Sequence, residues 1–136
     1  MEQKVFVDTA AWIALINSSD DLHTRARQQM STLREQRMFL VTTEFVLLEV
    51  ADALSEPERR AKTVAFIDGL RRLAVLQILP ASSGLFAAGW TRYSERPDKE
   101  WGLTDCISFV VMEQENLTQA FTSDHHFEQA GFVKLL

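Results

Sequence analysis

The sequence predicts one α/β domain spanning residues 1–136, with a mostly parallel central sheet of four to five strands and helices on both faces. Two observations predict this class. Short apolar runs alternate along the chain with longer segments of helical pattern, and strands that alternate with helices form parallel sheets. Glycine and proline are few and scattered, and no internal repeat or linker divides the chain, so we expect a single domain.

Local start and stop signals give the expected order of elements. An apolar strand at 4–7 precedes a short helix at 9–16, and Asp20 or Asp21 can cap a second helix that ends near residue 35. The remaining elements are expected in this order: a strand at 38–42, a helix at 45–54 capped by Thr42 or Thr43, a helix from Pro57 to about 73, a strand at 75–79 stopped by Pro80, a helix from Ser82 or Ser83 to about 93, a loop at 94–102, a helix at 103–115, a strand at 120–122 and a fifth strand at 132–134.

Composition and charge bound the class of protein and leave its partner open. No apolar run approaches the roughly 18 residues that span a bilayer, and no secretory signal peptide precedes the first strand. The single Cys106 excludes an internal disulfide and fits a reducing compartment, so we expect a cytoplasmic protein without a membrane partner. A net charge of −5 argues against nucleic acid, but local clusters of arginine soften that objection.

Four carboxylates lie inside or next to apolar segments, where a charge is costly. Asp8 and Asp124 follow two expected strands, whereas Glu49 and Asp105 interrupt two strongly apolar helices. The apolar residues around Glu49 cover nearly the whole helical circumference, so we expect it to be shielded from water. A lone buried carboxylate costs several kcal/mol unless it is paired, hydrogen-bonded or bound to a metal. Because ligands of open α/β sheets bind beyond the carboxyl ends of the strands, we expect the four groups to share one site there.

Helix capping is the structural alternative for the three aspartates. Each lies near a helix start, where a carboxylate can accept backbone N–H bonds. Glu49 has no capping explanation, and hydroxyl residues beside the aspartates could cap in their place. A shared divalent cation is therefore the preferred interpretation, and an all-oxygen ligand set indicates Mg²⁺ or Mn²⁺. The neighbouring hydroxyl residues are Thr9, Thr104 and Ser123.

Other phosphate chemistries lack their motifs in this chain. There is no glycine-rich phosphate loop followed by Lys and Ser or Thr, and no dinucleotide-binding fingerprint. A phosphatase of the haloacid-dehalogenase type would carry a second acid two residues after Asp8, where this chain has Ala10. Zinc prefers cysteine and histidine ligands. We interpret His125 and His126, which follow Asp124 directly, as the start of a surface helix.

Four segments present the carboxylates in order along the chain. They are Val7-Asp8-Thr9, Thr42-Thr43 with Val46 and Glu49, Leu103-Thr104-Asp105-Cys106, and Phe121-Thr122-Ser123-Asp124-His125-His126-Phe127. In these segments, and over essentially its whole length, the chain resembles the PIN-domain nucleases, most closely the VapC-like toxins of type II toxin–antitoxin pairs. Gly102 departs from the pattern, because relatives often have serine there.

The resemblance implies a Mg²⁺- or Mn²⁺-dependent endoribonuclease that forms homodimers and is inhibited by a cognate antitoxin protein. It implies that Asp8, Glu49, Asp105 and Asp124 bind metal and carry catalysis, with a metal-activated water attacking the RNA phosphodiester. Supporting roles beside the ligands or the substrate are expected for Thr9, Thr104 and Ser123. Asp98 resembles an additional acidic residue found in many relatives, and it either assists the metal or lies in a solvated loop.

Cationic and aromatic side chains flank the third carboxylate segment and are candidates for contacts with RNA. Arg92, Arg96 and Lys99 can contact the phosphate backbone, and Tyr93 and Trp101 can stack on bases. The structural alternative places Trp101 in the core and leaves the charges in solvent. Core or dimer-interface positions are expected for the two other tryptophans, Trp12 and Trp90.

Two other functions stay open at the level of sequence. The same metal site could act on structured DNA or a small phosphate ester, or the domain could be a catalytically idle binding or scaffold module. Intact carboxylates disfavour the idle module, since such a protein would gain stability by losing them. Metal-dependent cleavage of RNA, of DNA or of neither separates the three.

Overall fold

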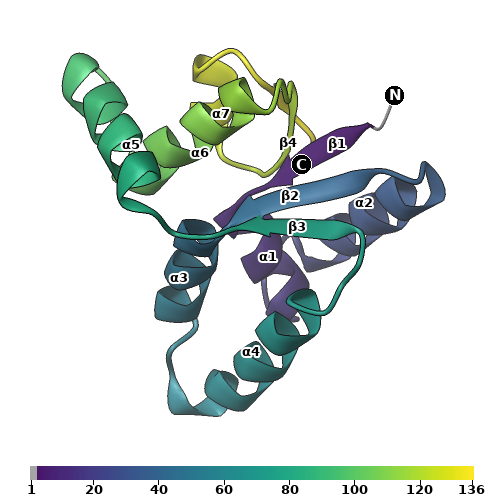
Figure 1. Ribbon diagram of the computed structural model, residues 1–136. Coiled ribbons are helices and arrows are strands. Elements are labelled where there is room, and N and C mark those ends of the chain that lie inside the picture. The colour runs from purple at the N-terminus through teal and green to yellow at the C-terminus, as the bar shows by residue number, and fades with distance from the viewer. Residues whose placement is uncertain (1–2) are drawn as a thin grey trace.

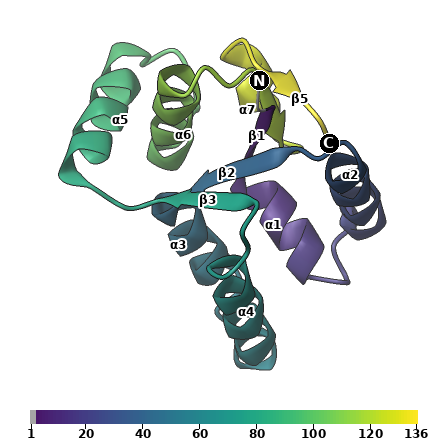
Figure 2. The ribbon, with the colours of Figure 1, turned by 45° about the vertical axis from the view of Figure 1, so that its right-hand side comes forward.

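The computed structural model describes residues 3–136 and contains one five-stranded parallel sheet with the strand order β3-β2-β1-β4-β5. Helices α1, α3 and α4 lie on one side of the sheet and α5, α6 and α7 on the other, and α2 packs on α1 (Figure 1 and Figure 2). The elements are β1 (Lys4–Val7), α1 (Thr9–Ile16), α2 (His23–Glu35), β2 (Phe39–Thr43), α3 (Glu44–Ala53), α4 (Pro57–Leu70), β3 (Leu76–Leu79), α5 (Ser83–Glu95), α6 (Leu103–Gln114), β4 (Gln119–Phe121), α7 (His125–Gln129) and β5 (Val133–Lys134).

The α/β architecture expected from the sequence is confirmed, and most element boundaries differ from expectation by one or two residues. The cap expected for the second helix is wrong, because α2 begins at His23 after Leu22 and neither Asp20 nor Asp21 is its N-cap residue. Asp20 Oδ1 instead accepts a hydrogen bond of 2.9 Å from the backbone N–H of Leu22. Its carboxylate therefore holds a turn that precedes the helix, a frequent use of aspartate.

The centre of the sheet is β1, which lies between β2 and β4. Its residues 5–7 are fully buried, as expected for a parallel strand covered on both faces. The pairing of β1 with β4 sets Val7 opposite Phe121 and continues one step further, where the Asp8 N–H donates to the Phe121 carbonyl at 3.1 Å. The carboxyl ends of β1 and β4 therefore lie at the same edge of the sheet.

Four aromatic rings pack beneath that edge. The ring of Phe127 in α7 lies 6.3 Å from Phe6 in β1 and 4.9 Å from Phe109 in α6. Phe109 also meets Trp101 edge to face at 5.1 Å. Each such pair adds about 0.5–1.5 kcal/mol beyond the burial of its area. The cluster fixes α6 and α7 relative to the central strand.

The tryptophans differ in their surroundings. Trp12 is 1% exposed, and its Nε1 donates to Thr42 Oγ1 at 3.3 Å, so its expected core position is confirmed. Trp90 is 53% exposed, which makes the core expectation wrong for this residue and leaves its interface role a prediction. Within residues 3–136, no helix has the length and apolarity needed to cross a membrane.

The close contact between α5 and α6 predicts the effect of adding a side chain at Gly89. A Cβ atom at this position would lie 2.3 Å from Ile107 Cγ1 and 3.2 Å from the Ile107 backbone. Gly89→Ala should therefore force the helices apart and lower the free energy of unfolding by about 2 kcal/mol, measured by urea denaturation. Gly69→Ala in α4 is the matched control, because nothing lies within 4 Å of its added Cβ. Equal stability of both variants would contradict this close packing.

Candidate active site

Asp8 is the buried centre of the site. It follows β1, is 3% exposed, and accepts a hydrogen bond of 2.9 Å from Thr122 Oγ1 beyond the end of β4. Burial raises the pKa of the Asp8 carboxyl to about 7, and the charges of Asp105 and Glu49 act in the same direction. Hydrogen bonds from the Thr9 backbone and the Thr122 hydroxyl oppose this rise. A nearby cation would return such a group to its charged form.

Asp105 and Asp124 meet at one histidine. Asp105 lies in the first turn of α6 and Asp124 directly before α7, and His126 Nδ1 is 3.1 Å from Asp105 Oδ2 and 3.3 Å from Asp124 Oδ1. Burial raises the pKa of Asp105, as does the charge of Asp124, whereas the Gly102 N–H and His126 lower it. The residues directly before the two aspartates, Thr104 and Ser123, are half-buried.

Glu49 is exposed, so the expectation that its apolar neighbours would shield it from water is wrong. Helix α3 buries Val46 and Val50 but leaves Leu48 61% exposed beside Glu49, and its solvent face is therefore partly apolar. The hydroxyl of Thr9, the first residue of α1, donates a hydrogen bond to Glu49 Oε1. This contact holds the Glu49 carboxylate next to Asp8 at the rim of the site.

Two of the three aspartates take part in capping, and the expectation that neighbouring hydroxyls would make them redundant is wrong. Asp124 Oδ1 accepts from the His126 N–H at 2.9 Å, and Asp105 Oδ2 accepts from the Gly102 N–H at 3.1 Å. Asp8 is the N-cap residue of α1 but makes no side-chain cap hydrogen bond of this kind, and within α1 only the backbone of the adjacent Thr9 acts on its carboxyl. Capping therefore explains Asp8 less well than the other two aspartates, although Asp8 is the most buried of the four carboxylates.

Asp98 is paired with a cation of the protein. Arg96 Nε and Nη2 donate to its two carboxylate oxygens, both at 3.0 Å, and this exposed pair lowers the pKa of Asp98. Arg92 of α5 is paired with Glu113 of α6 at 2.5 Å. Both oxygens of Asp98 are thus engaged by Arg96, and any assistance of Asp98 to a metal stays a prediction.

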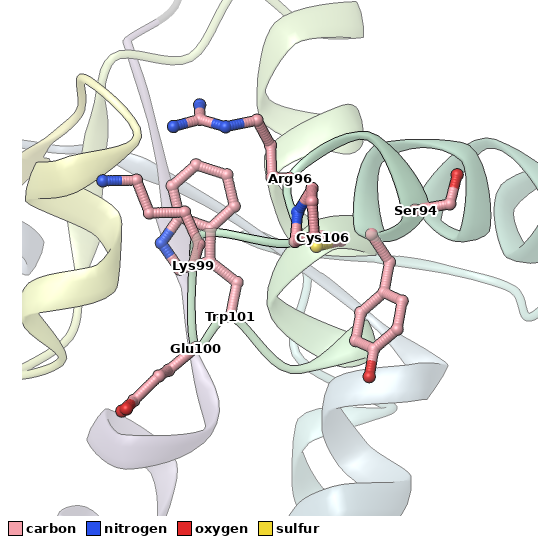
Figure 3. Close-up of a pocket in the computed structure, with 8 residues that line it drawn as sticks. Ser94, Arg96, Lys99, Glu100, Trp101 and Cys106 are labelled. Carbon is pink, nitrogen blue, oxygen red and sulfur yellow. The ribbon is translucent and has the colours of Figure 1, made fainter.

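Trp101 is 5% exposed, which supports its alternative position in the core and excludes an open ring for base stacking. Its Nε1 donates to Gln129 Oε1 at 3.0 Å. Two cations lie over the ring, with Arg96 Cζ 5.1 Å and Lys99 Nζ 5.9 Å from its centroid (Figure 3). Tyr93, by contrast, is 45% exposed and remains accessible.

The carboxylates fit a hard divalent cation. Mg²⁺ and Mn²⁺ prefer oxygen ligands, and a cation would remove the penalty that burial and mutual repulsion place on Asp8 and Asp105. Among residues 3–136, one trio of candidate ligands has donor atoms all within 4.8 Å of one another: Asp124, His125 and His126. The His125 side chain is 70% exposed, and His126 Nδ1 already contacts two carboxylates, so we regard the trio as the weaker candidate.

Two residues of the site were missed by the sequence analysis. Thr122 faces Asp8 only because β4 pairs with β1, and no local signal gives that pairing. His126, interpreted above as the start of a surface helix, does lie in α7, but its ring turns back onto Asp105. Its position two residues after Asp124, within the same capping turn, is the signal that could have suggested this contact.

The family model of the PIN domain matches residues 5–133, a span that includes all four carboxylates. The chain belongs to the PIN-domain family. The resemblance inferred from the four carboxylate segments is thereby confirmed. This PIN domain places its candidate site where parallel sheets bind ligands, beyond the carboxyl ends of the strands.

Relatives of this PIN domain include toxins. The chain is 27% identical over 131 residues to the 23S rRNA-specific endonuclease VapC20 of Mycobacterium tuberculosis, covering 96% of this chain and 97% of the relative. The crystal structure of VapC20, a sarcin-ricin loop cleaving toxin, matches with a TM-score of 0.83 over 95% of this chain and 96% of that chain. VapBC2 from Rickettsia felis, bound to a DNA fragment from its promoter, matches at 16% identity with a TM-score of 0.70 over 97% of both chains, which supports the fold alone.

The raised pKa of Asp8 predicts how the stability of the metal-free protein depends on pH. The carboxyl titrates near 3.8 when unfolded and near 7 when folded, so the folded protein holds the extra proton between these values. The contribution of Asp8 to the free energy of unfolding is therefore fully present below about pH 4 and is lost as the pH rises to about 7. Asp8→Asn should be more stable than wild type at about pH 8, in EDTA, and this advantage should shrink toward about pH 4.

Urea unfolding at a series of pH values measures this difference. Asp98→Asn is the control, because pairing with Arg96 lowers the pKa of Asp98 and its removal should bring no gain at high pH. A stability difference between Asp8→Asn and wild type that does not change with pH would contradict the proposed cost of burying Asp8.

Proposed function

We propose that this protein is a metal-dependent endoribonuclease of the toxin class, which hydrolyses phosphodiester bonds of RNA. The observation that carries the proposal is the convergence of Asp8, Asp105 and Asp124 beyond β1 and β4, with Glu49 beside them. Full-length similarity to a 23S rRNA-specific endonuclease supports the reaction class.

Mg²⁺ or Mn²⁺ is the proposed cofactor, held by Asp8, Asp105 and Asp124 with Glu49 at the rim. When bound, the ion supplies a water of lowered pKa and neutralises charge on the scissile phosphate. Metal-site carboxylates act through their charge, so replacement of any one by its amide removes a negative charge while keeping the shape of the side chain.

The surrounding groups of the chain hold these ligands in place. Thr122 fixes one oxygen of Asp8, and Thr9 orients Glu49. His126 holds Asp105 and Asp124 near each other through a single ring nitrogen. Such supporting contacts fix the orientation of metal ligands, and their loss commonly costs about 10- to 100-fold in affinity or activity.

We propose a structured ribosomal RNA as the substrate class. VapC20 cleaves the sarcin-ricin loop, and this chain matches it end to end at 27% identity. Sequence-specific recognition of RNA mostly targets loops, whose unstacked bases a protein can contact. A cytoplasmic location follows from this substrate, because that is where the ribosome works.

We also propose a cognate antitoxin protein as partner and a homodimer as the assembly. Structural neighbours of the same fold are VapBC complexes, which supports an antitoxin partner. Phe86 and Trp90 form a stacked, exposed aromatic pair on α5, with exposed fractions of 48% and 53%. An exposed apolar pair of this kind supports burial against another chain.

Replacement of one metal ligand should abolish cleavage. Asp8→Asn and Asp105→Asn, incubated with ribosomal and transfer RNA in Mg²⁺ or Mn²⁺, should leave the RNA intact while wild type produces discrete fragments. Asp20→Asn is the control, because Asp20 holds only a turn before α2. This variant should cleave RNA like wild type. EDTA should stop the wild-type reaction.

Different outcomes of that assay identify the alternatives. Cleavage of DNA in preference to RNA would replace the proposed substrate, and absence of any metal-dependent cleavage would favour a binding module. Unchanged RNA cleavage by both Asp8→Asn and Asp105→Asn would exclude this site as the catalytic centre.

Metal should also stabilise the fold. Because a cation neutralises the repulsion among the carboxylates, Mg²⁺ or Mn²⁺ should raise the melting temperature of metal-free wild type. The rise should disappear in Asp8→Asn, measured by thermal denaturation in the same buffers. An equal rise in both proteins would show that the ions bind elsewhere.

A further inference from the structure

A cavity of about 400 Å³ opens between the end of α5 and the start of α6 (Figure 3). Small-ligand sites begin at about 300 Å³, so the cavity can hold a group the size of one nucleotide. Tyr93 borders it from α5, and Cys106 from α6. The loop between the helices supplies the other walls, which include Arg96, Lys99 and Trp101.

The loop turns both cations to the same side. The Lys99 N–H donates to the Arg96 carbonyl at 3.1 Å, which closes a tight turn. Both charged ends then lie over the Trp101 ring, whereas Glu100 points away from them (Figure 3). Glu100 also lines the cavity. Because its carboxylate points away from the two cations (Figure 3), this part of a chain with a net charge of −5 still presents positive charge.

Each cation retains donors for a ligand. Asp98 accepts from Nε and Nη2 of Arg96, which leaves Nη1 of the guanidinium. Lys99 is held against Trp101 by its charge alone, and an ammonium group has three donors. A phosphate with several oxygens matches this set.

The cavity adjoins the carboxylate site. Cys106 lines the cavity and directly follows Asp105, so neighbouring residues of α6 face the two places. Trp101 is bonded to Gln129 of α7, the helix that begins after Asp124. The aromatic contact with Phe109 completes a rigid connection between cavity and site.

We propose that this cavity binds a nucleotide of the RNA that flanks the cleaved bond, with Lys99 and Arg96 on its phosphate and Tyr93 against its base. The proposal rests on the nuclease function above. The cavity then sets the register of the RNA, because a strand held here enters the carboxylate site at a fixed distance from the bound nucleotide. Exposed tyrosine is suited to this role, since it stacks on any base.

Binding of a short fluorescein-labelled single-stranded RNA, followed by anisotropy in EDTA, tests the cavity without cleavage. Lys99→Gln and Arg96→Gln should each weaken binding about two- to fivefold. Each should also lower the slope of log K against log salt by about 1. Lys99→Arg should bind like wild type because it keeps the charge. In the cleavage assay, the two glutamine variants should raise KM and leave kcat unchanged.

Lys62→Gln is the matched control, because it removes one exposed cation from α4 on the other side of the sheet (Figure 1). An equal loss of affinity in Lys62→Gln, or wild-type affinity in both cavity variants, would overturn the proposal. Because the binding assay needs no catalysis, it decides this point even if wild type cleaves no RNA. If wild type cleaves RNA and the cavity variants bind RNA as tightly as wild type, the nuclease function is supported and only the role proposed for the cavity is wrong.

Asp98 provides a test of opposite sign. Asp98→Asn removes the negative charge 3.0 Å from Arg96, so the RNA should bind more tightly than it does to wild type. Weaker binding would contradict the role given to Arg96.

Discussion

Burial of the Asp8 carboxylate is the constraint on which the rest of the site depends. It follows the central strand of a parallel sheet, and α1 begins at the next residue, so the side chain cannot reach bulk water. The pKa of about 7 measures the cost of that position, which the nearby charges of Asp105 and Glu49 increase. A divalent cation would offset this cost, because burial already deprives Asp8 and Asp105 of hydration by water. Burial of Asp8 therefore both destabilises the metal-free site and favours the binding of a metal ion.

The scaffold is rigid around the buried carboxylate and open at the rim. Thr42 accepts a hydrogen bond from Trp12 and donates one of 2.8 Å to the Val7 carbonyl, so the last residue of β1 is fixed from below. The aromatic cluster of α6 and α7 fixes the opposite wall through Phe127. Glu49 and the neighbouring cationic cavity lie toward solvent, where a long substrate can enter. This arrangement suits a nuclease, because its metal ligands must be held in fixed positions while its substrate is large.

The sequence predicted the order of the elements because strand runs, caps and prolines are local signals. It also predicted that Asp8 belongs to a shared edge, because apolar strands that end in a carboxylate place it beyond the sheet. It failed for Glu49, since composition does not reveal that Leu48 and Glu49 form the solvent face of α3. Thr122 and His126 depend on strand pairing and on the fold of α7 against α6, which are long-range facts. Family membership was accessible because four weak motifs occur in one order.

The most direct test of the shared cation site is anomalous diffraction from a crystal soaked in Mn²⁺. We expect one or two peaks bounded by carboxylate oxygens of Asp8, Asp105 and Asp124, and their loss in an Asp8→Asn crystal. A peak held only by Asp124, His125 and His126, or no peak beside Asp8, would contradict the claim that these carboxylates are maintained for a common ion.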